Sequence, residues 1–292
     1  MSDFVWTPSA DVVARSNVKR FMDRHGIADY GELVRRSTED VAWFWGAVER
    51  ELGIHWFAPY ERVLDDSEGP AWAKWFVGGK LNLAHQCVDV HAAANPERTA
   101  LIGEHEDGTV RAWSYAKLRE RVNRLCRALQ GLGVGPGDRV GIFLPMVPEN
   151  VTAMMAVAKL GAIFTPIFSG FAASAVASRL QDCEAKLLIT ADGFSRKGRA
   201  VPMKKTADEA VARCPSVERV LVLKHSHAPV PWNPKRDLWW HEQTRQQPAD
   251  FDALPVDSET PLMIAYTSGT TGKPKGAVHV HGGFLVKIAQ EA

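Results

Sequence analysis

Short apolar runs alternate with segments of helical periodicity over most of the second half of the chain. Strands that alternate with helices in this way are typical of right-handed βαβ units, whose parallel sheet is covered by helices. We therefore predict an α/β fold with a mostly parallel sheet flanked by helices. The predicted strands are residues 139–144, 162–168, 186–190, 217–223 and 261–267, and the predicted helices between them are residues 148–161, 173–184 and 206–214.

Residues 99–114 have a different pattern, with two short strand-like runs on either side of the turn Glu106-Asp107-Gly108. Ser114 is a suitable N-cap for the long amphipathic helix that follows. The apolar face of that helix carries Leu118, Val122, Leu125, Leu129 and Leu132. These segments extend the α/β body toward the N-terminus.

The first 80 residues are rich in tryptophan and are expected to be helical. Ser37 and Asp40 fit a capping pattern before the apolar run that begins at Val41. A glycine-containing joint follows at residues 76–82. We therefore expect a helical N-terminal cap over residues 1–80, and an α/β domain over residues 81–292 that is incomplete at its C-terminal end.

Composition excludes several classes of protein. The 292 residues carry a formal net charge of +1, which gives no indication of a nucleic-acid binder or a polybasic membrane anchor. The chain contains no apolar run of membrane-spanning length, and its first residues lack a signal peptide's pattern. The four cysteines are scattered without a CxxC pair, which favours reduced thiols in a cytoplasmic protein.

The segment "YTSGTTGKPKG", Tyr266 to Gly276, has the chemistry of a loop that binds a polyphosphate. Glycines free backbone N–H groups to converge on phosphate oxygens, while hydroxyls and lysines add donors and positive charge. It is not a Walker A loop, because only two residues separate Gly269 from Gly272 and Pro274 follows Lys273. The flanking residues predict strand, loop and strand. The alternatives are a plain mobile hairpin and a P-loop NTPase, and the spacing argues against the latter.

This string, followed by "HGG", resembles the signature loop of the adenylate-forming superfamily, which includes acyl-CoA synthetases, peptide-synthetase adenylation domains and luciferases. Residues 75–104 and 137–171 resemble stretches of acetyl- and propionyl-CoA synthetases, so the resemblance covers nearly the whole chain and is best from about residue 72 to residue 292. It is closest to the short-chain acyl-CoA synthetases. One departure is Val90, where the family often has arginine, and this puts the identity of the substrate in doubt.

The resemblance implies an α/β AMP-binding domain and a two-step ligase reaction. A carboxylate attacks the α-phosphate of ATP, held as its Mg2+ complex, and the CoA thiol then displaces AMP from the acyl-adenylate. In the first step the loop would neutralise the β- and γ-phosphates. Glycines at 269, 272 and 276 would let it close. The predicted phosphate contacts are Thr267, Ser268, Gly269, Thr270, Thr271, Gly272, Lys273 and Lys275.

A second basic segment, residues 193–205, follows a predicted strand at its C-terminal end, where open α/β sheets usually bind ligands. Its residues alone indicate a solvated basic loop. In acetyl-CoA synthetases the matching segment holds two arginines, three residues apart, that contact the 3′-phosphate end of CoA. Arg196 and Arg199 match that spacing, and Gly170 lies in a turn that resembles the lining of the pantetheine channel. A carrier-protein ligase would not need these arginines.

Two pairs of histidines, His225 with His227 and His279 with His281, alternate in sequence, the second pair on a predicted strand. Neither has a third ligand nearby, so we predict no metal site. The resemblance places the catalytic lysine and the magnesium-binding acid beyond Ala292. We therefore expect the N-terminal portion of a longer ligase, inactive alone. The alternative is a non-catalytic nucleotide- or CoA-binding module. The sequence leaves open the acid, the acyl and adenine pockets, the regulation and the oligomeric state.

Overall fold

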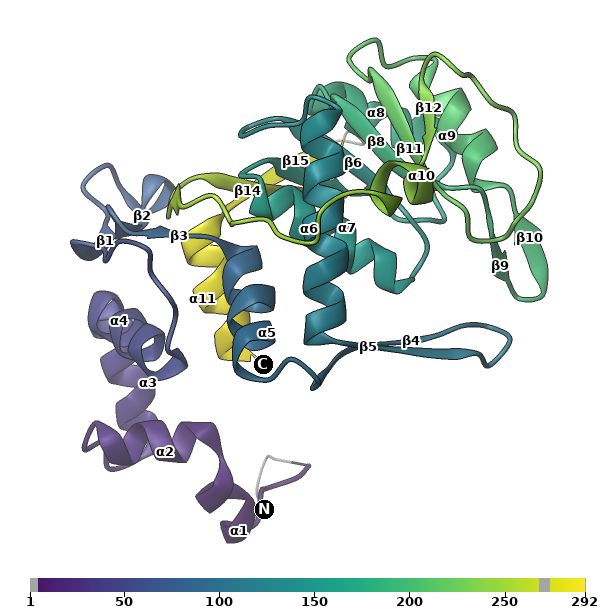
Figure 1. Cartoon of the computed structure of the whole chain (residues 1–292). Helices are drawn as coiled ribbons and strands as arrows, with labels where there is room; N and C mark the ends of the chain where they lie inside the picture. The colour runs from purple at the N-terminus through teal and green to yellow at the C-terminus, as the bar shows by residue number, and fades with distance from the viewer. Residues whose placement is uncertain (1–4, 268–273, 292) are drawn as a thin grey trace. The chain divides into compact units, whose positions relative to one another are not determined.

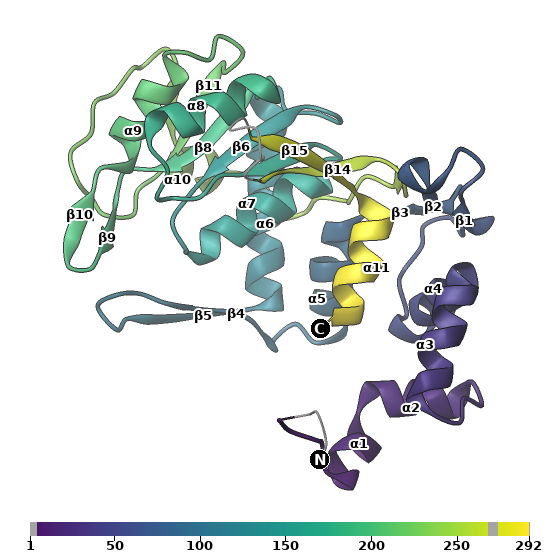
Figure 2. The same ribbon diagram turned by 180° about the vertical axis from the view of Figure 1, so that it is seen from behind.

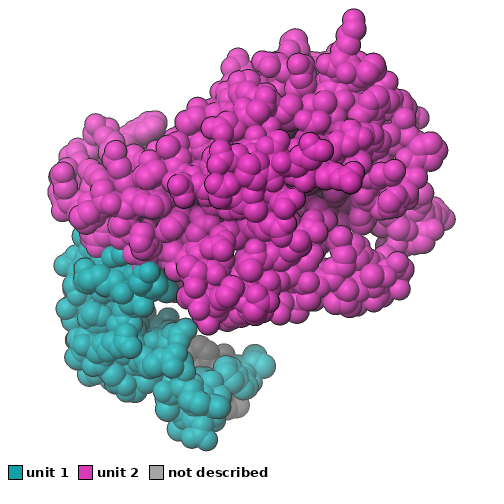
Figure 3. All heavy atoms as spheres, viewed as in Figure 1, with its two compact units in different colours: residues 1–53 teal, residues 54–292 magenta. Residues whose placement is uncertain are grey.

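The computed structural model describes residues 5–267 and 274–291, and the chain divides into two compact units (Figure 1, Figure 3). The smaller unit is Met1–Gly53 and the larger is Ile54–Ala292. Residues 54–80 group with the larger unit. The boundary between a cap over residues 1–80 and a domain over residues 81–292, which we expected from the sequence pattern, stays a prediction.

The described part of the smaller unit is helical, as predicted. Asp40 caps the last helix by accepting a hydrogen bond from the Trp43 N–H at 2.8 Å. Ser37 does not act as a cap, because it lies inside the preceding helix, where its hydroxyl bonds the Val34 carbonyl. The Arg36 guanidinium lies 3.8 Å from the centre of the Trp43 ring. The helices are α1 Ala10–Arg15, α2 Asn17–Arg24, α3 Tyr30–Glu39 and α4 Val41–Leu52.

Helix does not continue to residue 80, contrary to the expectation for the cap. A strand that includes Phe76, whose φ is 54°, ends in a tight turn at Gly78, whose φ is 80°. The Gly79 N–H closes this turn on the Phe76 carbonyl at 3.0 Å. At Gly79 a Cβ would lie 2.6 Å from the Trp56 ring, so only glycine fits there. The segment instead forms β1 Arg62–Asp65, the short helix η1 Pro70–Trp72, β2 Lys74–Val77 and β3 Lys80–Leu81.

A seven-stranded sheet in the described residues forms the centre of the larger unit. Its strand order is β12-β11-β8-β6-β7-β14-β15, and every neighbouring pair is parallel except β14 and β15. The predicted mostly parallel α/β fold is therefore confirmed. The strands are β6 Arg139–Phe143, β7 Ile163–Pro166, β8 Leu187–Ala191, β11 Arg219–Leu223, β12 Asp237–Trp239, β14 Pro261–Thr267 and β15 Lys275–Val280.

Helices cover both faces of this sheet. Helices α6, α7 and α10 pack together on one face, and α8 and α9 pack on the other (Figure 1, Figure 2). Ser114 caps α6 through the Lys117 N–H, and Pro148 occupies the first position of α7, as predicted. The helices are α6 Tyr115–Gly131, α7 Pro148–Lys159, α8 Ala173–Asp182, α9 Met203–Val211 and α10 Trp240–Arg245.

Two hairpins project from the larger unit, and both views place their tips side by side (Figure 1, Figure 2). The first, β4 Thr99–Glu104 with β5 Val110–Ser114, is the predicted pair around residues 106–108. The second, β9 Phe194–Arg196 with β10 Arg199–Val201, replaces the loop expected for the basic segment. The remaining elements are η2 His85–Asp89, α5 Val90–Ala94, β13 Val256–Asp257 and α11 His281–Glu291.

The prediction that His279 and His281 share one strand is wrong. His279 lies in β15, whereas His281 begins α11 and is fully buried. The Nδ1 atom of His281 accepts a hydrogen bond from the Leu83 N–H at 3.2 Å. No described helix is long and apolar enough to cross a membrane.

Candidate functional site

Three segments singled out in the sequence leave the same edge of the sheet. Because β6, β7, β8, β11 and β14 run parallel, their carboxyl ends lie along one edge. The turn with Gly170 follows β7, the hairpin with Arg196 follows β8, and the glycine-threonine loop follows β14. The adjacent strands β6 and β8 also send their connections to opposite sides, which opens a crevice where ligands usually bind.

A cleft of about 1000 Å³ lies at this crevice. Its walls come from the β4–β5 hairpin, the segment after β6, the turn after β7, the β9–β10 hairpin and the residues after β11. Two apolar side chains in its lining are strongly exposed, Met146 at 87% and Phe168 at 60%. The cleft therefore combines an apolar wall with the charged side chain of Arg196.

The structure places Arg196 and Arg199 directly opposite each other in the β9–β10 hairpin. The turn between them is Lys197-Gly198, with φ of 52° and 70°, so both residues adopt the left-handed conformation of a tight two-residue hairpin turn. The spacing of three residues therefore puts both guanidinium groups on neighbouring strands. Both arginines are exposed, which leaves their donors free for an anionic ligand.

Gly170 lies against this hairpin, which explains why the position requires glycine. A Cβ at Gly170 would lie 3.1 Å from Nη1 of Arg196 and 2.7 Å from the Phe168 ring. Any larger residue would displace the guanidinium or the ring. The sequence predicted Gly170 and Arg196 as separate members of one site, and the structure brings them together.

The tip of the β4–β5 hairpin contacts the β9–β10 hairpin, called here the arginine hairpin because it carries Arg196 and Arg199. The contact is made by a residue that sequence reasoning missed. The Glu106 carboxylate accepts hydrogen bonds from the backbone N–H groups of Lys197 and Gly198, the latter at 3.3 Å. These bonds, led by the one from Gly198, lower the pKa of Glu106. No local sequence signal links residues 106 and 197, because the contact depends on how two hairpins meet.

The glycine-threonine loop begins and ends on paired strand residues. Thr267 and Lys275 face each other across β14 and β15, and both are exposed. The strand–loop–strand prediction is confirmed for these flanks. The other predicted phosphate contacts, Ser268, Gly269, Thr270, Thr271, Gly272 and Lys273, lie outside the described residues.

Tyr266, immediately before the loop, has contacts that the sequence did not predict. Its hydroxyl donates to Oδ2 of Asp182 at 2.6 Å, and burial of the ring together with that bond raises the pKa of Tyr266. A Cβ at Gly276 would lie 2.9 Å from Ile264 and 3.2 Å from the Tyr266 ring. The Arg179 guanidinium lies 5.7 Å from the centre of the same ring. Gly276 therefore makes room for the tyrosine, in addition to the hinge role expected of it.

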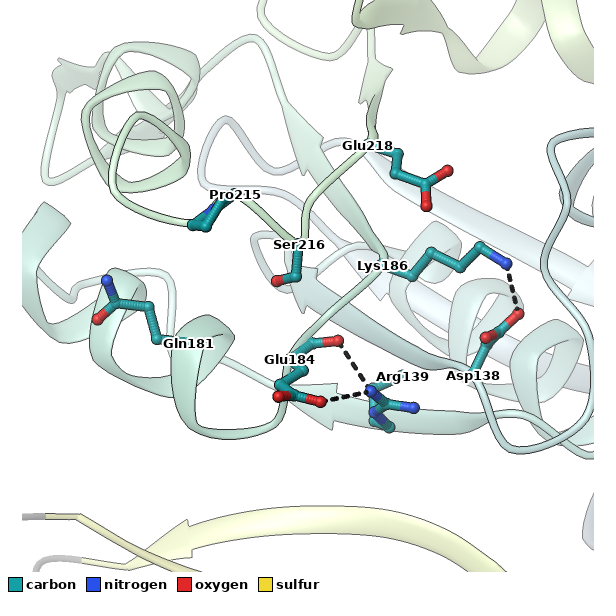
Figure 4. Close-up of a pocket in the computed structure, with 8 residues that line it drawn as sticks. All are labelled: Asp138, Arg139, Gln181, Glu184, Lys186, Pro215, Ser216 and Glu218. Carbon is teal, nitrogen blue, oxygen red and sulfur yellow. Dashed lines mark hydrogen bonds and ion pairs between the residues drawn. The ribbon is translucent and has the colours of Figure 1, made fainter.

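A second pocket, of about 680 Å³, lies at the opposite edge of the sheet (Figure 4). Its five charged side chains come from the amino ends of β6, β8 and β11 and from the end of α8. Four of them already pair with one another, since Arg139 contacts Glu184 at 3.4 Å and Lys186 contacts Asp138 at 3.0 Å, while the fifth is the carboxylate of Glu218. This pocket is therefore a weaker candidate for a ligand than the cleft at the carboxyl edge.

The described residues contain no group of three or more histidine, cysteine, aspartate or glutamate side chains suited to a metal ion. His225 lines the cleft, whereas His227 is exposed and is absent from its lining. The four cysteines are free thiols. Burial raises the pKa of Cys87 to about 11 and that of Cys126 to about 12, so both are poor nucleophiles.

Two family models match consecutive parts of the chain. The model described as acetyl-coenzyme A synthetase N-terminus matches residues 30–87, and the model described as AMP-binding enzyme matches residues 88–291. The second match alone covers more than half of the chain. It includes both flanks of the glycine-threonine loop and the arginine hairpin.

Similar proteins agree with these matches. The chain is 44% identical over 284 residues to an acetyl-coenzyme A synthetase of Mycolicibacterium smegmatis, covering 97% of this chain and 29% of the relative. It is 43% identical to one of Thiobacillus denitrificans, again over 97% of this chain but 42% of the relative. A solved acetoacetyl-CoA synthetase from Streptomyces lividans superposes with a TM-score of 0.90 and 31% identity, covering 97% of this chain and 44% of that one.

The chain thus spans well under half the length of these relatives. Within that span the likeness in sequence and in fold is continuous, and it extends through the cleft and the arginine hairpin. The segments that the resemblance pointed to in the sequence follow strands whose carboxyl ends lie along one edge of the sheet. The chain belongs to the AMP-binding enzyme family.

Proposed function

We propose that this chain supplies the phosphate-binding loop and the CoA-binding cleft of an AMP-forming acid–thiol ligase. The relatives named acetyl-coenzyme A synthetase make acetate the first carboxylate to test, with propionate next. We also propose a cytoplasmic location, on the basis of the scattered cysteine spacing. The observation that carries the proposal is that the loop, the glycine turn and the arginine hairpin leave one edge of the sheet.

In the first step a carboxylate oxygen attacks the α-phosphate of ATP, and pyrophosphate leaves. Mg2+ enters as part of the ATP complex and neutralises some of the phosphate charge. Bringing two anions together requires positive groups that are already in position. We assign this role to the backbone and hydroxyl donors of residues 267–272 and to Lys273, with Lys275 at the far end of the loop.

In the second step the CoA thiolate attacks the acyl carbonyl, and AMP leaves. The paired guanidinium groups of Arg196 and Arg199 suit a dianionic phosphate, because each can donate two parallel hydrogen bonds. The exposed apolar wall at Phe168, beside Gly170, suits the uncharged arm between that phosphate and the thiol. We therefore assign the phosphoadenosine end of CoA to the hairpin.

The test is binding of CoA to the double variant Arg196→Glu/Arg199→Glu, measured by isothermal titration calorimetry. The matched control is Arg213→Glu/Arg219→Glu, which makes the same change in net charge at exposed positions beside the amino end of β11. Loss of several charge-assisted hydrogen bonds should weaken CoA binding by about tenfold or more in the first variant only. Dephospho-CoA should lose much less affinity, and equal effects in both variants would remove the case for this site.

Catalysis is tested separately by carboxylate-dependent exchange between ATP and pyrophosphate. The exchange should be negligible for this chain, and it should appear with acetate or propionate in a protein of the relatives' full length that contains this chain. Binding of ATP and CoA with no exchange in either protein would instead favour a non-catalytic binding module.

A further inference from the structure

Two histidines lie together in the wall of the cleft. His105 follows β4 and His225 follows β11, so neither is close to the other in sequence. Their rings stack with centroids 5.5 Å apart and an interplanar angle of 30°. Both residues line the same cleft as Arg196.

The backbone on each side fixes the position of this pair. The N–H of His225 donates to Oδ1 of the buried Asp192 at 2.9 Å, which ties the end of β11 to the end of β8. The N–H of His105 bonds the Thr109 carbonyl at 2.9 Å within the hairpin turn. The next residue, Glu106, holds the turn of the arginine hairpin. The histidine pair is therefore attached to the segment that carries Arg196.

The other charges in the cleft do not favour a polyanion while both imidazoles are neutral. The lining includes three carboxylates and two guanidinium groups. One of the guanidinium groups, Arg111, is already paired with Glu149 at 2.8 Å. Protonation of the two imidazoles would change the net charge of the lining from negative to positive. The charged residues of the lining are Glu104, Glu106, Asp107, Arg111 and Arg196.

The surroundings of His225 disfavour its protonated form. Burial lowers the pKa of His225, and the neighbouring His105 and Arg111 lower it further. The carboxylates of Asp192 and Glu149 act in the opposite direction. On the hairpin side, Asp107 is the carboxylate that interacts with His105. A phosphate dianion placed beside an imidazole favours the protonated form of the ring.

We propose that His105 and His225 are further ligand-binding residues of this cleft, which take up protons when a phosphorylated ligand binds and so strengthen its binding at lower pH. The inference rests on the proposed CoA function of the cleft, and its ligand is the polyphosphate part of that molecule. Protons are taken from solvent, and no covalent step is involved. By linkage, a ligand that raises an imidazole pKa must bind more tightly as pH falls through that range.

The experiment is calorimetric titration of this chain with CoA at pH 6.5 and pH 8, in two buffers of different ionisation enthalpy at each pH. The wild-type chain should take up protons on binding at pH 6.5, and its affinity should be about three- to tenfold higher than at pH 8. The double variant His105→Asn/His225→Asn should lose both effects. His227→Asn is the matched control, because His227 is exposed and already has a φ of 58°, which asparagine tolerates.

The variants also distinguish proton uptake by the histidines from proton uptake by the ligand. The phosphate monoester of CoA has a second pKa of about 6, so its contribution is the same for the wild-type chain and for every variant. Equal proton uptake in the wild-type chain and the double variant would overturn the inference while leaving the CoA site intact. Absence of CoA binding at either pH would overturn the proposed function itself. Circular dichroism of each variant establishes that it is folded, and single substitutions replace the double variant if it is not.

Discussion

The most informative stability test concerns Lys159, whose side chain is fully buried at the end of α7. Its ammonium group donates to Oδ1 of Asp89 at 2.7 Å and to Oδ1 of Asn123 at 2.6 Å. These bonds join α7 to η2 and α6. Substitution Lys159→Met keeps most of the side-chain volume and removes the charge and both donors. It leaves Asp89 with the His85 imidazole, 3.4 Å away, as its remaining partner, and burial lowers the pKa of that imidazole.

Removing one member of a buried ion pair costs about 3–5 kcal/mol, because the other charge stays in a poorly solvated site. The Asp89 side chain is 15% exposed, so some water reaches it and the lower end of that range applies. We therefore expect the free energy of unfolding to fall by about 3 kcal/mol. With a urea dependence of about 2–3 kcal/mol per molar, the midpoint should fall by about 1–1.5 M.

Urea unfolding followed by circular dichroism measures this change, and two further variants test its cause. Lys159→Met/Asp89→Leu removes both charges and should recover at least half of the loss, because an apolar pair can replace a buried ion pair. Lys186→Met breaks the half-exposed pair with Asp138 and should cost no more than about 1 kcal/mol. If Lys159→Met cost no more than Lys186→Met, the argument from burial would be wrong.

Three other substitutions test packing, hydrogen bonding and pH dependence. Gly141→Ala should cost about 1–3 kcal/mol in urea unfolding, because its Cβ would lie 2.4 Å from a Leu180 methyl group in the core. Tyr266→Phe removes the bond to Asp182 and should cost about 1 kcal/mol; no change in unfolding free energy would mean that water replaces the bond. Burial lowers the pKa of His281 to about 4 from an unfolded value of 6.5, so the stability it contributes is present above pH 6.5 and is lost as pH falls toward 4. Between pH 7 and pH 5 the wild type should lose about 2 kcal/mol more than His281→Asn, which keeps an acceptor for the Leu83 N–H; equal losses would refute this.

Periodicity was sufficient for the elements of the central sheet. The apolar runs at residues 139–144 and 186–190 and the cap at Ser114 all formed what their patterns predicted, because local preference and burial agree there. Periodicity failed where contacts are non-local. The expected helix beyond Leu52 is a set of short strands, and residues 224–258, for which no strand or helix was predicted, contain β12 and α10. His281 was assigned to a strand because alternation alone cannot show where a strand ends.

For the candidate site, the sequence by itself determined which chemical groups are present: the glycine-threonine loop, the arginines at 196 and 199, and the glycine at 170. Their spacing and their position after predicted strands required no tertiary information. The tertiary structure decided which groups meet. Parallel pairing brought the three segments to one edge of the sheet, and the meeting of two hairpins placed Glu106 on the arginine turn and His105 on His225. Such contacts join residues about 90 to 120 positions apart, and local sequence carries no signal for them because they depend on strand order.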